Sequence, residues 1–313
     1  MLAEQVRSGL GETTHDGVVC VVDAGGAVVA SSGDITRPFY LRSAAKPFQA
    51  YVSQSLGAGL SQLELAMACA SHRGFPVQVA LVRSMLGKAD LDETFLRCPA
   101  DWPLGAEAAE TLVRSGAHSK RSLWHNCSGK HAGFLRACVA QGWPTDSYLS
   151  PDHPLQQAVI QYVSGAGDFE VEPVGVDGCG APVLRTSALA MATLFSRLAN
   201  DDRLVEVRTA MQRYPALVGV NGSGDTEIAI AIGGVAKGGA AGCVGVAVEG
   251  RLGLAVKSWD GSHTIASSVA ANALDQIGVL NATSRKALSA FLTPPVLGGG
   301  REVGQIETRL ELA

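Results

Sequence analysis

The sequence is poor in several features that mark particular classes of protein. Aromatic residues make up 5% of its 313 residues and charged residues 17%. It has no run of basic residues and a net charge of −4, which argues against a nucleic-acid partner or an anionic membrane surface. No apolar stretch has the length of a membrane span, and the longest, such as residues 18–22, are typical of strands. With 47% hydrophobic residues, the chain predicts a large core and little disorder.

Several common motifs and signals are also absent. The sequence has no Gly-x-Ser-x-Gly elbow, His-Glu-x-x-His, P-loop or Gly-x-Gly-x-x-Gly, so a nucleotide enzyme or an α/β-hydrolase is disfavoured. The first residues include the acidic Glu4 and do not form a basic-then-apolar leader, which argues against secretion through a signal peptide. Seven cysteines, an odd number spread over the chain, fit a reducing compartment. We therefore expect a cytoplasmic protein.

Hydrophobic periodicity predicts β-structure at both ends of the chain and helices between them. The predicted strands are residues 18–22, 27–31, 171–176, 227–232, 243–248 and 252–259, with a final alternating segment at 302–310. The predicted helices are residues 44–56, 61–69, 77–86, 106–115, a segment after 133 closed by Gly142, 153–163, 187–199, 203–214, 262–277 and 284–292. This order predicts one α+β domain, 1–313, with a sheet lobe (about 1–40 and 225–313) built from both chain ends and an inserted helical lobe (about 41–224).

A hydroxyl and an amine lie three residues apart at the start of the first predicted helix, as Ser43 and Lys46. Proline is tolerated only in the first turn of a helix, so Pro47 places Ser43 at or near the N-terminus. There the helix dipole favours negative charge on the serine oxygen and disfavours charge on the lysine. This is what a Ser-Lys hydrolase requires, with the amine accepting the proton of the alcohol. The alternative is a helix cap followed by a solvated lysine.

Other stretches combine reactive groups with turns or glycines. Ser71 and His72 follow an apolar helix, and Lys237 precedes two glycines; a cap and a surface lysine are the alternatives. Cys127 and Lys130 would share a helical face, and Cys179 lies between glycines. Two thiolates and a nitrogen donor suit zinc better than magnesium or calcium, whereas two inert buried cysteines are the alternative.

Taken together, these stretches resemble the asparaginase II family, the Rhizobium etli-type L-asparaginases. The matching segments run in the family's order over nearly the whole chain. They are residues 33–34, 42–50, 71–74, 125–133 (His-Asn-Cys-Ser-Gly-Lys-His-Ala-Gly), 148–156, 177–182, 237–240 and 260–261.

The resemblance implies a fold similar to serine β-lactamases, penicillin-binding proteins and glutaminases, a homodimer, and hydrolysis of L-asparagine to L-aspartate and ammonia. Motif by motif, it implies a nucleophile pair, Ser43 and Lys46, with a second serine, Ser71, and a second lysine, Lys237. It implies a bound Zn²⁺ with the ligands Cys127, Lys130 and Cys179. The residues it implies around the substrate are Arg42, His72, Asn126, His131 and Asp177.

The chain departs from the family pattern at several positions near these motifs. Arg73 and Phe75 stand where a small residue and a glutamate are usual, Ala241 replaces an acidic residue, and no arginine follows His263. None of these changes removes the expected nucleophile, base or metal ligands. They leave open a different small amide as substrate, such as glutamine or a β-aspartyl compound. They also leave open a non-catalytic amino-acid- or zinc-binding homologue and, by fold analogy alone, a β-lactam-binding serine protein.

Overall fold

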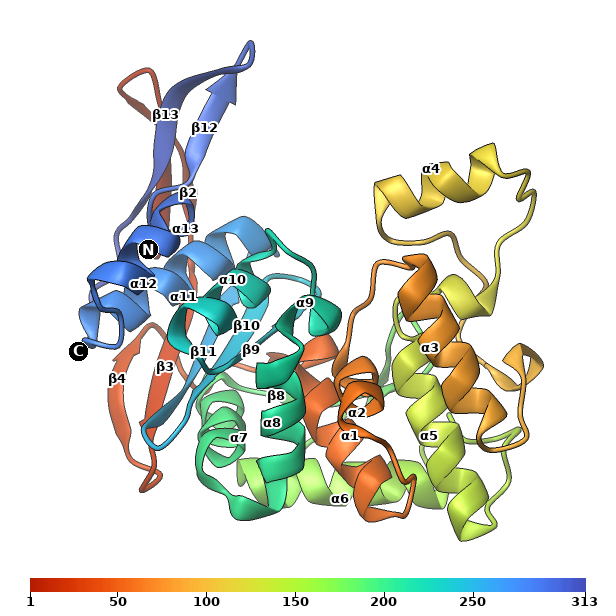
Figure 1. Cartoon of the computed structure of the whole chain (residues 1–313). Coiled ribbons are helices and arrows are strands. Elements are labelled where there is room, and N and C mark those ends of the chain that lie inside the picture. Colours follow the sequence, from red (N-terminus) through yellow and green to blue (C-terminus); the bar gives the residue numbers. More distant parts are fainter.

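A five-stranded antiparallel sheet joins the two ends of the chain. The computed structural model describes residues 1–313, and the strand order of this sheet is β4-β3-β11-β10-β9. Its strands are β3 (Gly17–Asp23), β4 (Val28–Ser32), β9 (Val235–Gly239), β10 (Cys243–Val248) and β11 (Leu252–Ser258). The central pairing places Val19 of β3 opposite Val256 of β11, so residues far apart in sequence are neighbours in the middle of the sheet (Figure 1).

Both faces of this sheet are buried, because alternate side chains of each strand point to opposite sides. In β3, Val18 and Val22 belong to one apolar cluster, and Val19 and Val21 belong to the other. Helix α7 (Ala188–Asn200) covers the first face and α11 (His263–Gln276) the second. Gly253 permits the close approach of α7, since a Cβ atom there would lie 2.0 Å from the backbone nitrogen of Ser196.

A second, four-stranded sheet also combines both chain ends, in the order β12-β13-β1-β2. Its strands are β1 (Ala3–Arg7), β2 (Leu10–His15), β12 (Pro295–Gly298) and β13 (Arg301–Thr308). Val296 and Ile306 contribute to the same apolar cluster as α11, and the hairpins extend away from the rest of the molecule (Figure 1). Two short pairs complete the β-structure, β5 (Phe39–Tyr40) with β8 (Arg185–Thr186) and β6 (Gly175–Val176) with β7 (Pro182–Val183).

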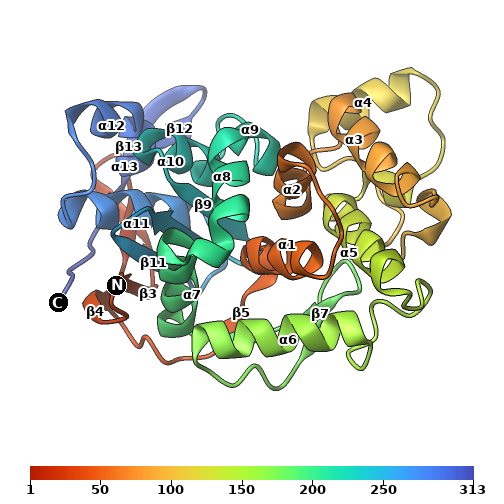
Figure 2. The ribbon, with the colours of Figure 1, turned by 60° about the horizontal axis from the view of Figure 1, so that its bottom comes forward.

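The helices between the two sets of strands pack mainly beside the five-stranded sheet, as Figure 2 shows. They are α1 (Lys46–Ser55), α2 (Gln62–Cys69), α3 (Pro76–Gly87), α4 (Ala106–Arg114), α5 (Ser128–Gln141), α6 (Pro154–Gly167), α8 (Val205–Arg213), α9 (Pro215–Val218) and α10 (Gly224–Ile232). Two more, α12 (Ala282–Ala287) and α13 (Ser289–Leu292), precede β12. The larger apolar cluster continues from the α7 face of the sheet into α1, α2 and α5. None of the helices has both the length and the hydrophobicity needed to cross a membrane.

The structure confirms the α+β class, with strands from both chain ends and helices inserted between them. It also corrects two predicted strands. Residues 227–232 belong to helix α10, and only Gly175–Val176 of residues 171–176 forms a strand. The strands β1, β2, β9 and β12 were not predicted. The division into two lobes remains a prediction, although α7, which it assigned to the helical lobe, packs on the sheet.

Candidate active site

Ser43 lies in a single 3₁₀ turn, Arg42–Ala45, directly before helix α1. Arg42 has a φ of +50°, a left-handed conformation that is uncommon for a residue with a side chain. Its Nε donates to Oδ1 of Asp177 at 2.7 Å, which anchors the turn to the loop between β6 and β7. Backbone strain of this kind persists where surrounding contacts enforce it, and it is found preferentially at functional sites.

Strand β9 lies against this turn because residue 239 has no side chain. A Cβ atom at Gly239 would lie 2.9 Å from the backbone oxygen of Leu41 and 3.1 Å from the backbone nitrogen of Ala44. The close approach brings Lys237 of β9 toward the start of α1. Lys237 and Lys46 are each only 1% exposed. The end of the sheet and the start of α1 therefore contribute two buried amines to one region.

An open cavity of about 470 Å³ lies between these elements. Four of the residues predicted from sequence meet in its lining: Ser43, Ser71, Asn126 and Lys237. The other lining residues are Arg73, Leu104, Gly219, Ser223, Gly224, Asp225, Gly238, Gly239, Ala240, Val244, His263 and Ser267. The four predicted residues thus contribute two hydroxyl groups, an amide and a buried amine from four separate segments of the chain.

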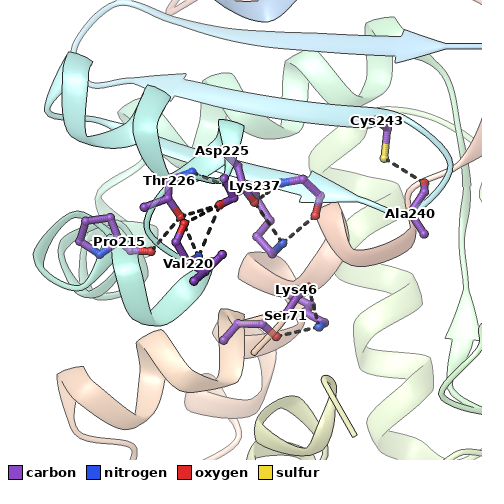
Figure 3. Close-up of polar contacts among 12 residues, drawn as sticks. Lys46, Ser71, Pro215, Val220, Asp225, Thr226, Lys237, Ala240 and Cys243 are labelled. Carbon is purple, nitrogen blue, oxygen red and sulfur yellow. Dashed lines mark hydrogen bonds and ion pairs between the residues drawn. The ribbon is translucent and has the colours of Figure 1, made fainter. Parts of the chain in front are cut away.

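The side chain of Lys46 points toward Ser71. Its Nζ donates to Oγ of Ser71 at 3.0 Å and to the backbone oxygen of Ala70 at 2.7 Å (Figure 3). No hydrogen bond joins Lys46 to Ser43. Ser71 itself is held by its backbone N–H, which donates to the backbone oxygen of Val218 at 3.0 Å. Lys46 and Ser71 therefore form a fixed pair beside the cavity.

Asp225 is a site residue that the sequence analysis missed. It lies in the first turn of α10, and its Oδ2 accepts from the backbone N–H of Gly238 at 2.9 Å and lies 3.7 Å from Nζ of Lys237 (Figure 3). Its Oδ1 accepts from Ser223 and from the backbone N–H of Thr226. The available signal was the polar Gly222-Ser-Gly-Asp225 segment before an apolar run, which is typical of a helix N-terminus.

The surroundings of Lys237 make its neutral form more accessible than that of an ordinary lysine. Burial lowers the pKa of Lys237, and the neighbouring Lys46 lowers it further, while the carboxylate of Asp225 opposes them. The pKa of Asp225 is lowered even though burial alone would raise it, because Lys237 and the N–H of Gly238 stabilise the carboxylate. Nζ of Lys237 also donates to the backbone oxygen of Gly238 at 2.6 Å. An amine with a lowered pKa can accept a proton at a pH where an ordinary lysine is charged.

The three expected zinc ligands converge behind the cavity, in what we call the thiol cluster: Cys127, Lys130 and Cys179. Nζ of Lys130 lies 3.1 Å from Sγ of Cys179, and all three side chains are buried. The hydrogen bond from Cys127 and the charge of Lys130 lower the pKa of Cys179, and the same bond raises the pKa of Cys127. Burial disfavours the charge on Lys130, but the two sulfur atoms outweigh it and raise its pKa. Sγ of Cys127 also lies 3.6 Å from Oδ1 of Asn126, which lines the cavity.

The donor set of the thiol cluster suits zinc in kind. Two sulfur ligands and a nitrogen are typical of zinc sites, although a lysine must lose its proton to coordinate. No group of three or more His, Cys, Asp and Glu side chains that would hold a metal is present, so the amine of Lys130 would have to serve as the third ligand. A further nitrogen, Nε2 of His131, is buried next to Cys179 without a hydrogen-bond partner.

The remaining predicted residues lie outside the lining of the cavity. Arg42 and Asp177 bind each other. His131 is fully buried, its Nδ1 lies 2.7 Å from Oη of Tyr148, and burial lowers its pKa to about 4. His72 is also fully buried, with Nδ1 accepting from the backbone N–H of Gly74 and Nε2 lying 2.8 Å from Oγ of Ser128. Burial, together with Lys46, lowers the pKa of His72 to about 3. His72 and His131 thus support the loops around the site from within the core.

Comparisons with known proteins give one match over nearly the whole chain. The sequence model of a family described as L-asparaginase II matches residues 3–308. No curated protein matches the sequence.

Solved structures give weaker similarity. Mglu, in its tris and glutamate form, has a TM-score of 0.39 and 14% identity, and the match covers 89% of this chain and 63% of the Mglu chain. The chain therefore spans less than two thirds of the length of that protein. A Bacillus glutaminase has a TM-score of 0.39 and 11% identity, with 84% of this chain and 91% of the glutaminase chain covered. Similarity this low does not indicate that the proteins share a reaction.

Proposed function

Because the chain belongs to the L-asparaginase II family, we propose that it hydrolyses L-asparagine to L-aspartate and ammonia through an acyl-enzyme on Ser43. The observation that carries this proposal is the cavity itself, in which Ser43, Ser71 and the buried amine of Lys237 come together. A hydroxyl group beside a neutral amine is the pairing that activates a serine nucleophile.

In the proposed reaction, Oγ of Ser43 attacks the side-chain amide carbon and gives its proton to a lysine. The C–N bond then breaks, and the leaving nitrogen takes a proton and departs as ammonia. Ser71, held by Lys46, is placed to pass that proton. Water then attacks the ester on Ser43, which releases aspartate and restores the serine.

Two observations bear on which lysine accepts the proton of Ser43. The sequence motif favours Lys46, but Lys46 does not line the cavity, and its Nζ donates to Ser71 and Ala70. Lys237 lines the cavity together with Ser43, and its pKa is lowered by burial and by Lys46. We therefore assign proton acceptance to Lys237 and the positioning of Ser71 to Lys46.

The thiol cluster supports a proposed zinc ion held by Cys127, Lys130 and Cys179. A bound zinc would supply positive charge beside the cavity and hold the loops of Cys127 and Cys179 together. Because the proposed nucleophile is a serine, the reaction has no need for a metal-bound hydroxide. The homodimer and the cytoplasmic location remain expectations from the resemblance and from the sequence.

The test is ammonia release by the purified protein from L-asparagine, L-glutamine and a β-aspartyl amide. We expect asparagine to be the best substrate and Ser43→Ala to lose about 10³-fold or more in kcat, as removal of a serine nucleophile does. The exposed Ser115, on the C-terminal side of α4, provides a matched control, Ser115→Ala. Wild-type turnover by Ser43→Ala would refute the mechanism. A preference for another amide would keep the mechanism and change the substrate, and aspartate binding without turnover of any amide would indicate a binding protein.

A further inference from the structure

Arg73 is the one arginine in the lining of the cavity, and no partner occupies its guanidinium. Its backbone is fixed, since its N–H donates to Oε1 of Gln78 at 3.1 Å and its carbonyl oxygen accepts from the N–H of Gly105 at 2.9 Å. Its side chain makes no ion pair or hydrogen bond, and its Nε is buried without any partner. A buried, unbonded guanidinium N–H is costly unless a ligand completes it.

The charges around Arg73 do not supply that partner. The only carboxylate in the lining is Asp225, whose two oxygens are already used by Gly238, Ser223, Thr226 and Lys237. His263 also lines the cavity and lies near enough to Arg73 for their charges to interact, and burial lowers its pKa. The cavity thus has one cation, the guanidinium of Arg73, that is free to bind an anionic group of a ligand. It has no free carboxylate that could bind an ammonium group.

Resting on the proposed function, we propose that Arg73 binds the free carboxylate of the substrate, so that the cavity selects monoamides of dicarboxylic acids and treats the α-amino group as dispensable. A guanidinium binds a carboxylate through two parallel N–H groups, which fixes the position of the ligand as well as its charge. With its carboxylate bound by Arg73, the substrate would have the carbon of its side-chain amide held next to Ser43. The family pattern has a small residue at this position, so this anchor is a property of the present chain.

Three substrates separate the carboxylate from the ammonium group. L-Asparagine has both groups, succinamic acid has only the carboxylate, and β-alaninamide has only the amine. We expect the wild-type protein to hydrolyse succinamic acid within about tenfold of asparagine, and β-alaninamide about 10- to 100-fold less well in kcat/KM, as for the loss of a charged hydrogen bond. Arg73→Gln is expected to lose about 10- to 100-fold on asparagine, mainly in KM, and to leave the rate on β-alaninamide unchanged.

Arg73→Lys keeps the positive charge but cannot bind a carboxylate through two parallel N–H groups. It should therefore recover part of the asparagine activity that Arg73→Gln loses. The control is Arg83→Gln, which removes the same charge from helix α3, outside the cavity. Because the buried Nε of Arg73 has no partner within the protein, Arg73→Gln should unfold at the same temperature as the wild type or at a higher one. The proposal is overturned if Arg73→Gln reduces asparagine and β-alaninamide turnover equally, or if wild type hydrolyses these two substrates equally well.

Calorimetric titration with L-aspartate and with succinate gives a readout that does not depend on turnover. We expect both to bind wild type and Arg83→Gln alike, and both to bind Arg73→Gln about 10- to 100-fold more weakly. If no amide is hydrolysed but this difference in binding is found, the proposed reaction fails and the carboxylate site stands. If amides are hydrolysed and the binding of both acids is unchanged by Arg73→Gln, the carboxylate site fails and the reaction stands.

Discussion

Two buried lysines on either side of this site respond to burial in opposite ways. Lys130 is 3% exposed and Lys237 is 1% exposed. The pKa of Lys130 is raised, because the sulfur atoms of Cys179 and Cys127 outweigh its burial. The pKa of Lys237 is lowered, because burial and Lys46 outweigh the carboxylate of Asp225. Burial by itself therefore does not determine the charge of a lysine, and the neighbouring groups give these two amines different properties.

The same comparison separates two kinds of work. The raised pKa of Lys130 favours a charged amine beside the sulfur atoms, which suits it to holding the loops of Cys127 and Cys179 together. The lowered pKa of Lys237 makes its neutral, proton-accepting form more accessible than that of an ordinary lysine. Replacing each lysine by methionine, which has a similar volume and no charge, should therefore lower turnover most at Lys237 and metal content most at Lys130.

The largest effect is expected from Lys237→Met. Because the proposed proton acceptor is removed, kcat should fall by about 10²- to 10⁴-fold on asparagine. The free energy of unfolding should fall as well, because the removal of Lys237 leaves the carboxylate of Asp225, 3.7 Å from Nζ, without the cation that stabilises it. Steady-state kinetics and urea unfolding measure the two quantities. Full turnover by Lys237→Met, with turnover lost in Lys46→Met, would return the role of base to Lys46.

Lys130→Met should act on stability and on metal content. Removing the buried amine breaks its hydrogen bond to Sγ of Cys179, so we expect the metal-free protein to lose about 1 to 3 kcal/mol of unfolding free energy. If the thiol cluster holds zinc, the protein as purified should contain about one zinc per chain by elemental analysis, and Lys130→Met should contain much less. Unchanged stability together with unchanged zinc content would show that the two lysines do not differ as we describe.

The smallest effect is a shift in pH dependence. The carboxylate of Asp225 raises the pKa of Lys237, so Asp225→Asn should lower that pKa further. The neutral amine then forms at lower pH, and the rising limb of kcat/KM against pH should move to lower pH. Asn retains an oxygen that can accept from the N–H of Thr226 or Gly238. If the rising limb of the Asp225→Asn profile stays in place or moves to higher pH, the group that titrates is not Lys237.

Local patterns allowed part of this structure to be predicted from sequence. Ser61 and Glu64 form the capping box of α2, and Gly142 takes the left-handed conformation that ends α5. The strands around Val19 and Val246 have the apolar composition of a sheet buried on both faces. The reactive stretches lie together in the structure: four of the residues named from sequence line one cavity, and Cys127, Lys130 and Cys179 form one cluster. Their roles remain predictions.

The misses have identifiable physical causes. The run Ile228-Ala-Ile-Ala-Ile232 alternates like a strand, but it lies in α10, where Ile228 is buried and Ile230 is exposed. Taking it as a strand hid the helix N-terminus that carries Asp225. Strand β9 was not predicted, because the reason for Gly239 lies in its contact with Leu41, almost two hundred residues away. The unbonded side chain of Arg73 is likewise a property of its surroundings, which a residue pattern does not reveal.

The pairing of β3 with β11 also matters while the chain is being made. Val19 meets Val256 only after more than two hundred further residues have been synthesised, which takes about 10 to 50 s at ordinary translation rates. During that time the edge of β3 that pairs with β11 lacks its partner strand. Contacts so distant in sequence are slow to form, and an unpaired apolar strand is prone to aggregate. Production of this protein should therefore benefit from slower synthesis at low temperature and from added chaperones.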